Sequence, residues 1–195
     1  TVCCLLISIL GSYAMTRLKY PGRRFFKTSI IFSYLIPTAV LFVPMYVFVS
    51  KLGFYDNKWA LLIIYPTTVV PYCCYMLMSY FKAIPYALEE AALIDGCTRM
   101  KSLRYIITPI ALPGIAVVAT FAFTMSWNEY LYAMIMTTSP AQQTAVVAIS
   151  SFKYADSAIW GRIMAASVLT SLPVTIIYIV AQAQLISGKS DGSVK

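Results

Sequence analysis

The sequence predicts an all-α integral membrane protein, and three observations support this fold class. Only 11% of the 195 residues are charged, whereas soluble domains carry roughly 25% charged residues. The mean hydropathy is +0.76, and 60% of the residues are hydrophobic. Apolar stretches long enough to cross a bilayer core as a helix, which takes about 20 residues, recur along the chain. We therefore expect a polytopic helix bundle.

Five apolar segments qualify, or nearly qualify, as membrane helices: 1–16, 29–50, 59–81, 106–136 and 163–186. The first has neither a start methionine nor a basic region before it, so we expect a fragment whose N-terminal helix is missing. Prolines inside the second, third and fifth segments should kink them. The fourth segment is too long for one straight helix, so we expect a connecting piece or a bend near Pro109 and Pro113.

The basic residues are unevenly divided between the loops, and this predicts the orientation. Most of the 15 Lys and Arg residues follow the first and third segments or lie in the tail. Membrane proteins concentrate Lys and Arg in cytoplasmic loops, so these loops and the C-terminus should face the cytoplasm. A net charge of +8 also suits a nucleic-acid-binding protein. Its clustering beside apolar segments favours a membrane rim, and we expect no nucleic-acid partner.

The sequence contains few residues in patterns suited to catalysis or metal binding. There is no histidine, and four of the five cysteines form adjacent pairs inside apolar runs, so we interpret them as small apolar residues rather than metal ligands. Gly188-Lys189-Ser190 lacks the earlier glycine of a phosphate-binding loop. We expect no catalytic residue, no metal and no cofactor in this chain.

The third loop contains an acidic stretch, KAIPYALEEAALIDG, which holds three of the seven acidic residues. Pro85 suits the first turn of a helix that we place at residues 86–94. Gly96 can end that helix because it adopts a positive φ without steric cost, and Thr98 can cap a second short helix. We name the resulting helix–turn–helix at residues 82–105 the elbow, and place it on the cytoplasmic face.

Two interpretations of the elbow are open. It could be a surface helix at the lipid interface, but such helices are rich in Lys and Arg. This helix carries acids beside small alanines, which permit close approach of another protein. We favour a docking surface for a basic cytoplasmic partner, formed by Glu89, Glu90, Ala91, Ala92, Asp95, Gly96 and Arg99.

The order Glu90-Ala91-Ala92, Asp95-Gly96 and then Leu112-Pro113 resembles the EAA loop of ABC-importer permeases. The resemblance extends over nearly the whole chain. The WNEY stretch, Trp127-Asn128-Glu129-Tyr130, and the polar tail resemble the carbohydrate branch, the maltose-permease-like subunits. The resemblance implies a type I importer fold with five membrane helices present, a permease domain at 1–186 and a polar cytoplasmic tail at 187–195.

The resemblance also implies partners. The elbow would be the coupling helix, with Glu90 pairing with a basic residue in a cleft of an ATP-binding subunit. Two such subunits would bind ATP and Mg. A second permease chain would complete the pore, and an extracytoplasmic solute-binding protein would deliver a sugar or oligosaccharide.

Alternatives remain for the WNEY stretch and for the function. Trp127, Asn128, Glu129 and Tyr130 could line the substrate pathway, or they could form an aromatic belt at the outer interface. The solute could instead be an amino acid, a peptide or an ion. Less favoured alternatives are a non-transport membrane scaffold and an intramembrane enzyme.

Overall fold

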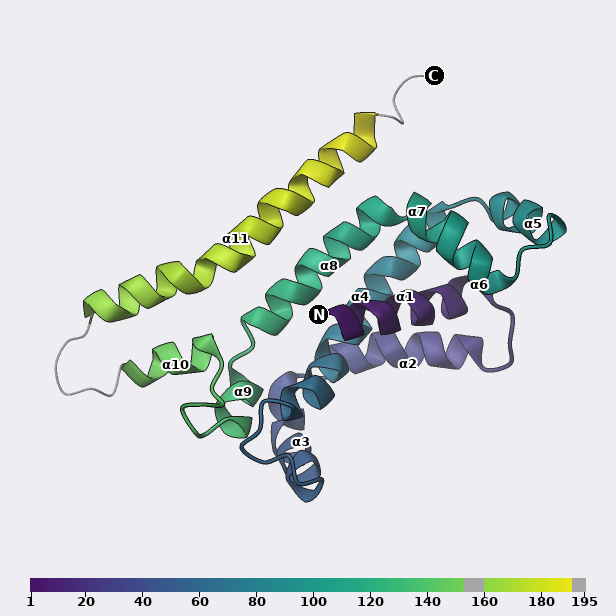
Figure 1. Ribbon diagram of the computed structural model, residues 1–195. Coiled ribbons are helices and arrows are strands. Elements are labelled where there is room, and N and C mark those ends of the chain that lie inside the picture. Colours follow the sequence, from purple (N-terminus) through teal and green to yellow (C-terminus); the bar gives the residue numbers. More distant parts are fainter. Residues whose placement is uncertain (153–159, 191–195) are drawn as a thin grey trace.

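The structure is a computed structural model that describes residues 1–152 and 160–190, with side chains omitted at 151 and 183–190. Over these residues every regular element is helical, which confirms the all-α prediction (Figure 1). The last helix, α11, spans Trp160–Ser190. Its final turn therefore includes the start of the predicted tail, while residues 191–195 lie outside the described part of the chain.

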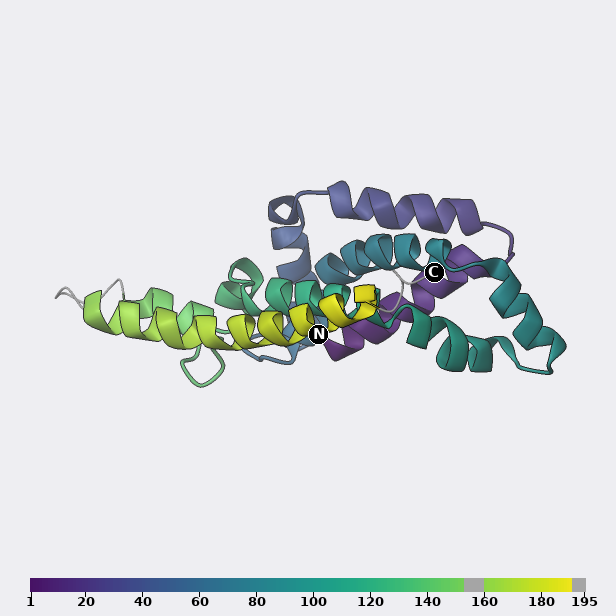
Figure 2. The ribbon, with the colours of Figure 1, turned by 90° about the horizontal axis from the view of Figure 1, so that it is seen from above.

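Four helices lie side by side across the molecule, in the order α2 (Arg23–Leu35), α4 (Ala60–Ala83), α8 (Leu112–Trp127) and α11 (Figures 1 and 2). Helix α1 (Val2–Arg17) packs against α4 and α8. The short helices gather at the two ends. Helices α5 (Tyr86–Ile94) and α6 (Arg99–Ser102) lie at one end, and α9 (Leu131–Met136) and α10 (Ala145–Ser151) lie at the other.

The segment predicted at 29–50 is broken rather than kinked. Helix α2 ends at Leu35, and α3 (Thr38–Lys51) leaves it at 101°. Ile36 is extended, with φ −73° and ψ 122°, because the ring of Pro37 disfavours a helical conformation in the residue before it. Pro44 lies inside α3 without ending it.

The long segment predicted at 106–136 also divides, close to the expected position. A π-helical turn (Leu103–Ile107) and α7 (Thr108–Ile110) continue α6. The stretch Arg99–Ile110 then meets α8 at 84°. Pro109 and Pro113 occupy first-turn positions of α7 and α8, where their missing N–H groups cost nothing. The predicted bend is confirmed.

Helices α4 and α11 are individually long and apolar enough to cross a membrane, and the number rises to four if each bent pair forms one span. Helix α1 is apolar but shorter, with 16 residues. Pro66 and Pro71 lie inside α4, and Pro173 lies inside α11.

Small side chains hold α1 against α4. Ser8 and Ser12 are fully buried, and the Ser12 hydroxyl donates to the Cys74 carbonyl at 3.2 Å. The Cα of Gly11 faces the same cysteine, whose sulfur would lie 3.4 Å from an added Cβ. Such residues let membrane helices approach closely, with hydroxyls bonding across the interface. Cys4 and Cys73 are also buried in this core, as expected of small apolar residues.

Candidate functional site

The first helix of the elbow, α5, spans the predicted residues and ends in a glycine turn. The Cys97 N–H donates to the Ala92 carbonyl at 2.9 Å, and the Gly96 N–H donates to the Leu93 carbonyl at 3.2 Å. This pair of bonds defines a Schellman motif, which needs a left-handed residue after the helix. Gly96 supplies it with φ 85°, so the predicted positive φ is confirmed.

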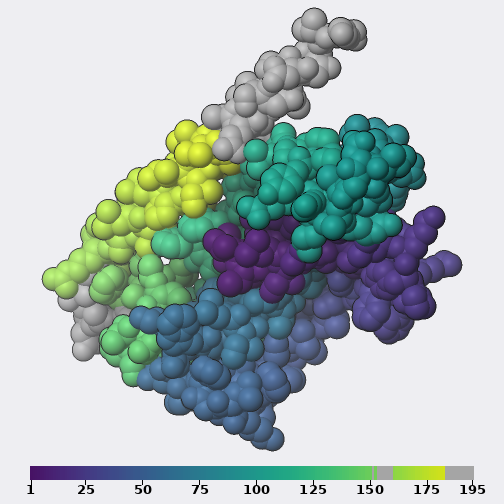
Figure 3. All heavy atoms as spheres, turned by 45° about the vertical axis from the view of Figure 1, so that its right-hand side comes forward, coloured from purple at the N-terminus to yellow at the C-terminus, as the bar shows by residue number. Residues whose placement is uncertain are grey.

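The second helix of the elbow begins at the predicted cap. The Thr98 hydroxyl accepts a hydrogen bond from the Lys101 N–H at 3.3 Å. Helix α6 continues through the π-helical turn to the bend before α8. The elbow is therefore continuous with a core helix, and Figure 3 shows it as a teal block beside the dark purple of α1.

A buried carboxylate fixes the elbow to α1. Glu89 is only 3% exposed. Its Oε1 accepts a hydrogen bond from the Tyr13 hydroxyl at 2.5 Å and lies 3.4 Å from Arg99 Nη1. Its Oε2 lies 3.9 Å from Arg17 Nε. We call these four residues the Glu89 cluster; they join α1, α5 and α6.

Arg17 extends the cluster to the end of α4. Its side chain is fully buried, and its Nη2 donates to the Phe81 carbonyl and, at 2.6 Å, to the Ile84 carbonyl. Carbonyls at a helix C-terminus lack partners within the helix, and a basic side chain satisfies them well. The guanidinium also lies 4.2 Å from the centroid of the Tyr86 ring, a cation–π distance.

The structure separates the predicted docking residues into two groups. Glu89 and Ala92 lie three positions apart on one helix face, and both are buried, contrary to our expectation that they lie on the docking surface. Arg99 is half exposed. The outward face of α5 and its glycine turn includes Glu90, Ala91, Ile94, Asp95 and Gly96; we call these five residues the outward face of the elbow.

Sequence reasoning missed three residues of this site. Tyr13 and Arg17 lie more than 70 positions before Glu89, and Arg17 is indistinguishable in the sequence from an ordinary basic residue at a helix end. Ile94 is 85% exposed. An apolar side chain at the tip of a polar elbow is a signal that the sequence did offer.

The WNEY stretch lies at the other end of α8 from the elbow. The Trp127 ring N–H donates to the Thr170 carbonyl of α11 at 3.0 Å, and its ring stacks on Phe123. The Glu129 carboxylate accepts the Tyr132 and Ala133 N–H groups at 2.9 and 3.1 Å. These two predicted pathway residues therefore already have partners in the chain, while Asn128 and Tyr130 are exposed.

The loops beyond α3 and α9 are joined at this same end. The Ser139 N–H donates to Asp56 Oδ1 at 2.8 Å, and the Ser139 hydroxyl donates to Oδ2. These bonds lower the pKa of the Asp56 carboxyl. The Asn57 N–H adds a bond to the Met136 carbonyl at 3.1 Å. The end opposite the elbow is thus a connected surface.

Comparison with known proteins identifies relatives over the whole chain. The chain is 37% identical to the inner membrane ABC transporter permease protein YcjP of Escherichia coli, covering 100% of this chain and 70% of that protein. It is 31% identical to the diacetylchitobiose uptake system permease protein DasC of Streptomyces coelicolor (100% and 72% covered). It is 33% identical to the trehalose/maltose transport system permease protein MalG of Thermococcus litoralis, covering 97% of this chain and 68% of that protein.

Solved structures share the fold. A bacterial ABC transporter that imports the acidic polysaccharide alginate matches with a TM-score of 0.80 at 23% identity, covering 94% of this chain and 69% of that one. The MetNI methionine ABC transporter matches with a TM-score of 0.70 at 17% identity, covering 96% of this chain and 92% of that one. Residues 7–189 match the family described as binding-protein-dependent transport system inner membrane component. The chain belongs to this family of ABC transporter permeases.

Proposed function

We propose that this chain is the membrane-spanning permease subunit of an ATP-driven importer for a sugar or oligosaccharide. The observation that carries the proposal is the elbow, whose buried face is fixed to α1 and α4 and whose first helix and glycine turn expose Glu90, Ala91, Ile94 and Asp95. Two of the relatives are named for sugar transport and one solved neighbour imports a polysaccharide. A solute-binding protein delivers the substrate to the end where the α3–α4 and α9–α10 loops meet.

The outward face of the elbow docks an ATP-binding subunit. Glu90 pairs with a basic residue of that subunit, Ala91 and Gly96 allow its backbone to approach, and Ile94 fills an apolar part of the cleft. Glu89, Ala92 and Arg99 position this face from beneath. Two ATP-binding subunits bind the ATP and Mg, so ATP hydrolysis takes place outside this chain.

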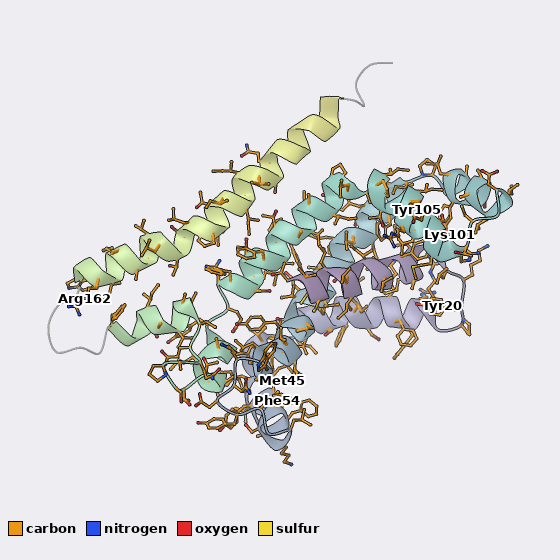
Figure 4. The ribbon with its side chains drawn as sticks, viewed as in Figure 1. Tyr20, Met45, Phe54, Lys101, Tyr105 and Arg162 are labelled. Carbon is orange, nitrogen blue, oxygen red and sulfur yellow. The ribbon has the colours of Figure 1, made fainter. Side chains whose placement is uncertain are left out.

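The elbow and the C-terminus face the cytoplasm, with five membrane crossings made by α1, the α2–α3 pair, α4, α8 and α11. Tyr20, Lys101 and Tyr105 lie at the elbow end, whereas Arg162 lies at the opposite end (Figure 4). A second permease chain and lipid cover the remaining apolar faces. In support, the most apolar window of α11 has no buried residue, and none is buried in α2.

The shared fold of the methionine transporter keeps a permease for another solute as the alternative. A scaffold without transport activity would not stimulate ATP hydrolysis in a partner. Measuring uptake of several solutes by the reconstituted transporter distinguishes the three.

Replacing Glu90 by Lys is expected to release the ATP-binding subunit. Reversing the charge removes an interfacial ion pair and adds repulsion, which costs about 2 kcal/mol or more. The subunit should no longer co-purify with the tagged permease, and ATP-dependent uptake should fall at least tenfold. Lys58→Glu, a charge change of the same size and opposite sign at an exposed residue of the α3–α4 loop, should leave co-purification unchanged. Undiminished co-purification with Glu90→Lys would refute the docking assignment.

Replacing Tyr130 by Ala is expected to weaken sugar recognition if this exposed ring lines the pathway. Losing one aromatic contact should cost about 1 kcal/mol, which raises the sugar concentration for half-maximal uptake about fivefold. Tyr105→Ala removes an exposed ring at the elbow end and is the control. Equal uptake curves for the two variants would assign Tyr130 to an interfacial belt instead.

A further inference from the structure

A group of basic residues beside the elbow forms no ion pair with the acids of residues 1–152 and 160–182. We call Lys19, Arg23, Arg24, Lys27 and Lys82 the α2 basic patch. In the described part of the chain both ion pairs involve Glu89 and neither reaches the patch. Lys27 of α2 and Lys82 of α4 nevertheless lie next to each other. Like charges at such proximity repel, so the patch is incomplete without an anion.

The start of α2 adds further positive charge that a bound anion would neutralise. The helix begins after Gly22, which has φ 81°, with no side-chain cap and no acid in its first turn. Arg23 and Arg24 occupy that turn instead. A helix N-terminus carries partial positive charge, so cations there are unfavourable. The same geometry favours a phosphate, because free N–H groups point outward from the first turn.

The patch is also hollowed and partly preorganised. A groove of about 470 Å³ is lined by Tyr20, Gly22, Arg23, Arg24 and Lys27. Arg23 is held in place, because its Nε donates to the Met15 carbonyl at 2.8 Å and its Nη2 to the Thr16 carbonyl at 2.7 Å.

A second groove, of about 780 Å³, shares Tyr20 and Arg23 with the first and continues towards the elbow. Glu89 and Glu90 also line this second groove, and Glu89 Oε2 already lies 3.9 Å from the buried Nε of Arg17. The anion therefore belongs in the first groove, which only basic residues, Tyr20 and Gly22 line.

The surroundings of the patch suit a lipid rather than a soluble anion. Phe25 and Phe26, on the same turn as Arg24, are 70% and 54% exposed. The Tyr20 ring lies 6.3 Å from that of Phe26. Aromatic rings next to basic side chains are typical of the membrane interface, where rings meet acyl chains and cations meet headgroups. In Figure 3 the violet start of α2 projects at the same end as the teal elbow.

We propose that the α2 basic patch binds the phosphate of an anionic phospholipid in the cytoplasmic leaflet. The proposal rests on the orientation given under the proposed function. The bound headgroup neutralises the first turn of α2 and holds the α1–α2 connection beside the elbow. Its phosphate satisfies Arg24 and Lys27, while Arg23 keeps its bonds to α1.

Native mass spectrometry of the detergent-purified transporter tests this binding with phosphatidylglycerol, and with phosphatidylcholine as the zwitterionic comparison. Removing two patch charges with Arg24→Gln plus Lys27→Gln should lower phosphatidylglycerol retention about thirtyfold, because each basic residue near an anionic surface contributes about a factor of five. Lys101→Gln plus Arg104→Gln removes the same charge from the elbow and should leave retention unchanged. Equal loss in both variants, or none in the first, would overturn the site.

Two further arms separate the remaining outcomes. Soluble glycerol phosphate at millimolar concentration should not displace the lipid; efficient displacement would mean that the ligand is a free phosphate and would overturn the lipid assignment. The charge-preserving pair Arg24→Lys and Lys27→Arg should restore retention, so a folding defect is distinguishable. Retention is measured without ATP or uptake, so it is independent of whether an ATP-binding subunit docks.

Discussion

A transporter carrying Glu89→Gln is expected to lose most of its uptake and to become less stable, although it keeps the shape of the side chain. The substitution leaves the fully buried guanidinium of Arg17 without its carboxylate and removes the charged acceptor of the Tyr13 hydroxyl. Breaking a buried charged pair in this way costs about 3 kcal/mol or more. Elbow and α1 should separate, so ATP hydrolysis in the partner no longer drives transport.

The adjacent residue provides the matched control. Glu90→Gln makes the same chemical change one position along α5, at an exposed site. It should weaken docking while leaving the melting temperature of the purified permease unchanged, whereas Glu89→Gln lowers both. In a double-mutant cycle, Tyr13→Phe should add little to Glu89→Gln because both remove one interaction. Equal melting temperatures for the Glu89 and Glu90 variants would contradict the role of the cluster.

Gly114→Val is expected to disrupt the contact between α4 and α8. A Cβ at Gly114 would lie 2.5 Å from Cγ and 2.8 Å from Cε1 of the Tyr80 ring, far inside van der Waals contact. Cγ is the fixed root of the ring, so the helices must move apart. Overpacking of this kind costs about 3 kcal/mol. Because α8 follows the bend that ends the elbow, both melting temperature and uptake should fall.

Two further variants test whether the clash with Tyr80 causes the loss of stability and uptake in Gly114→Val. Gly161→Ala adds a Cβ to another helical glycine, but there nothing lies within 4 Å of it, so it should be neutral or slightly stabilising. Tyr80→Ala combined with Gly114→Val should recover much of the loss, because removing the ring makes room. A double variant as unstable as Gly114→Val would show that the ring is not the obstacle.

The features that depend on neighbouring residues in the sequence, such as the ends of α5 and the cap of α6, were predicted correctly. The bounds of α5 follow from Pro85 and Gly96, which act through their own backbone angles, and the Thr98 cap follows from its hydroxyl. Prolines were less informative. Pro37 separates two helices at 101°, while Pro66 and Pro71 leave α4 unbroken. Proline removes the same donor at each position, so its presence alone does not distinguish a break from a helix that continues.

The facing of the elbow could not be predicted for the same reason. Glu89 and Glu90 are chemically identical neighbours, and only contact with α1 makes one buried and the other exposed. That contact joins residues 76 positions apart, and neither helical periodicity nor capping rules reach so far. The sequence therefore located the elbow but could not say which of its acids faces outward.

The separation of Tyr13 from Glu89 also has a consequence for biosynthesis. When α1 has just been synthesised and inserted, the ribosome has not yet made Glu89, whose carboxylate pairs with Tyr13 and Arg17. Those side chains can complete their bonds only after α4 has entered the bilayer and packed against α1. The elbow thus reaches its final place only after α1 and α4 have packed together, so a permease in which this pair is misassembled would not present the proposed docking surface correctly. Docking of the ATP-binding subunit would in this way depend on correct packing of α1 against α4.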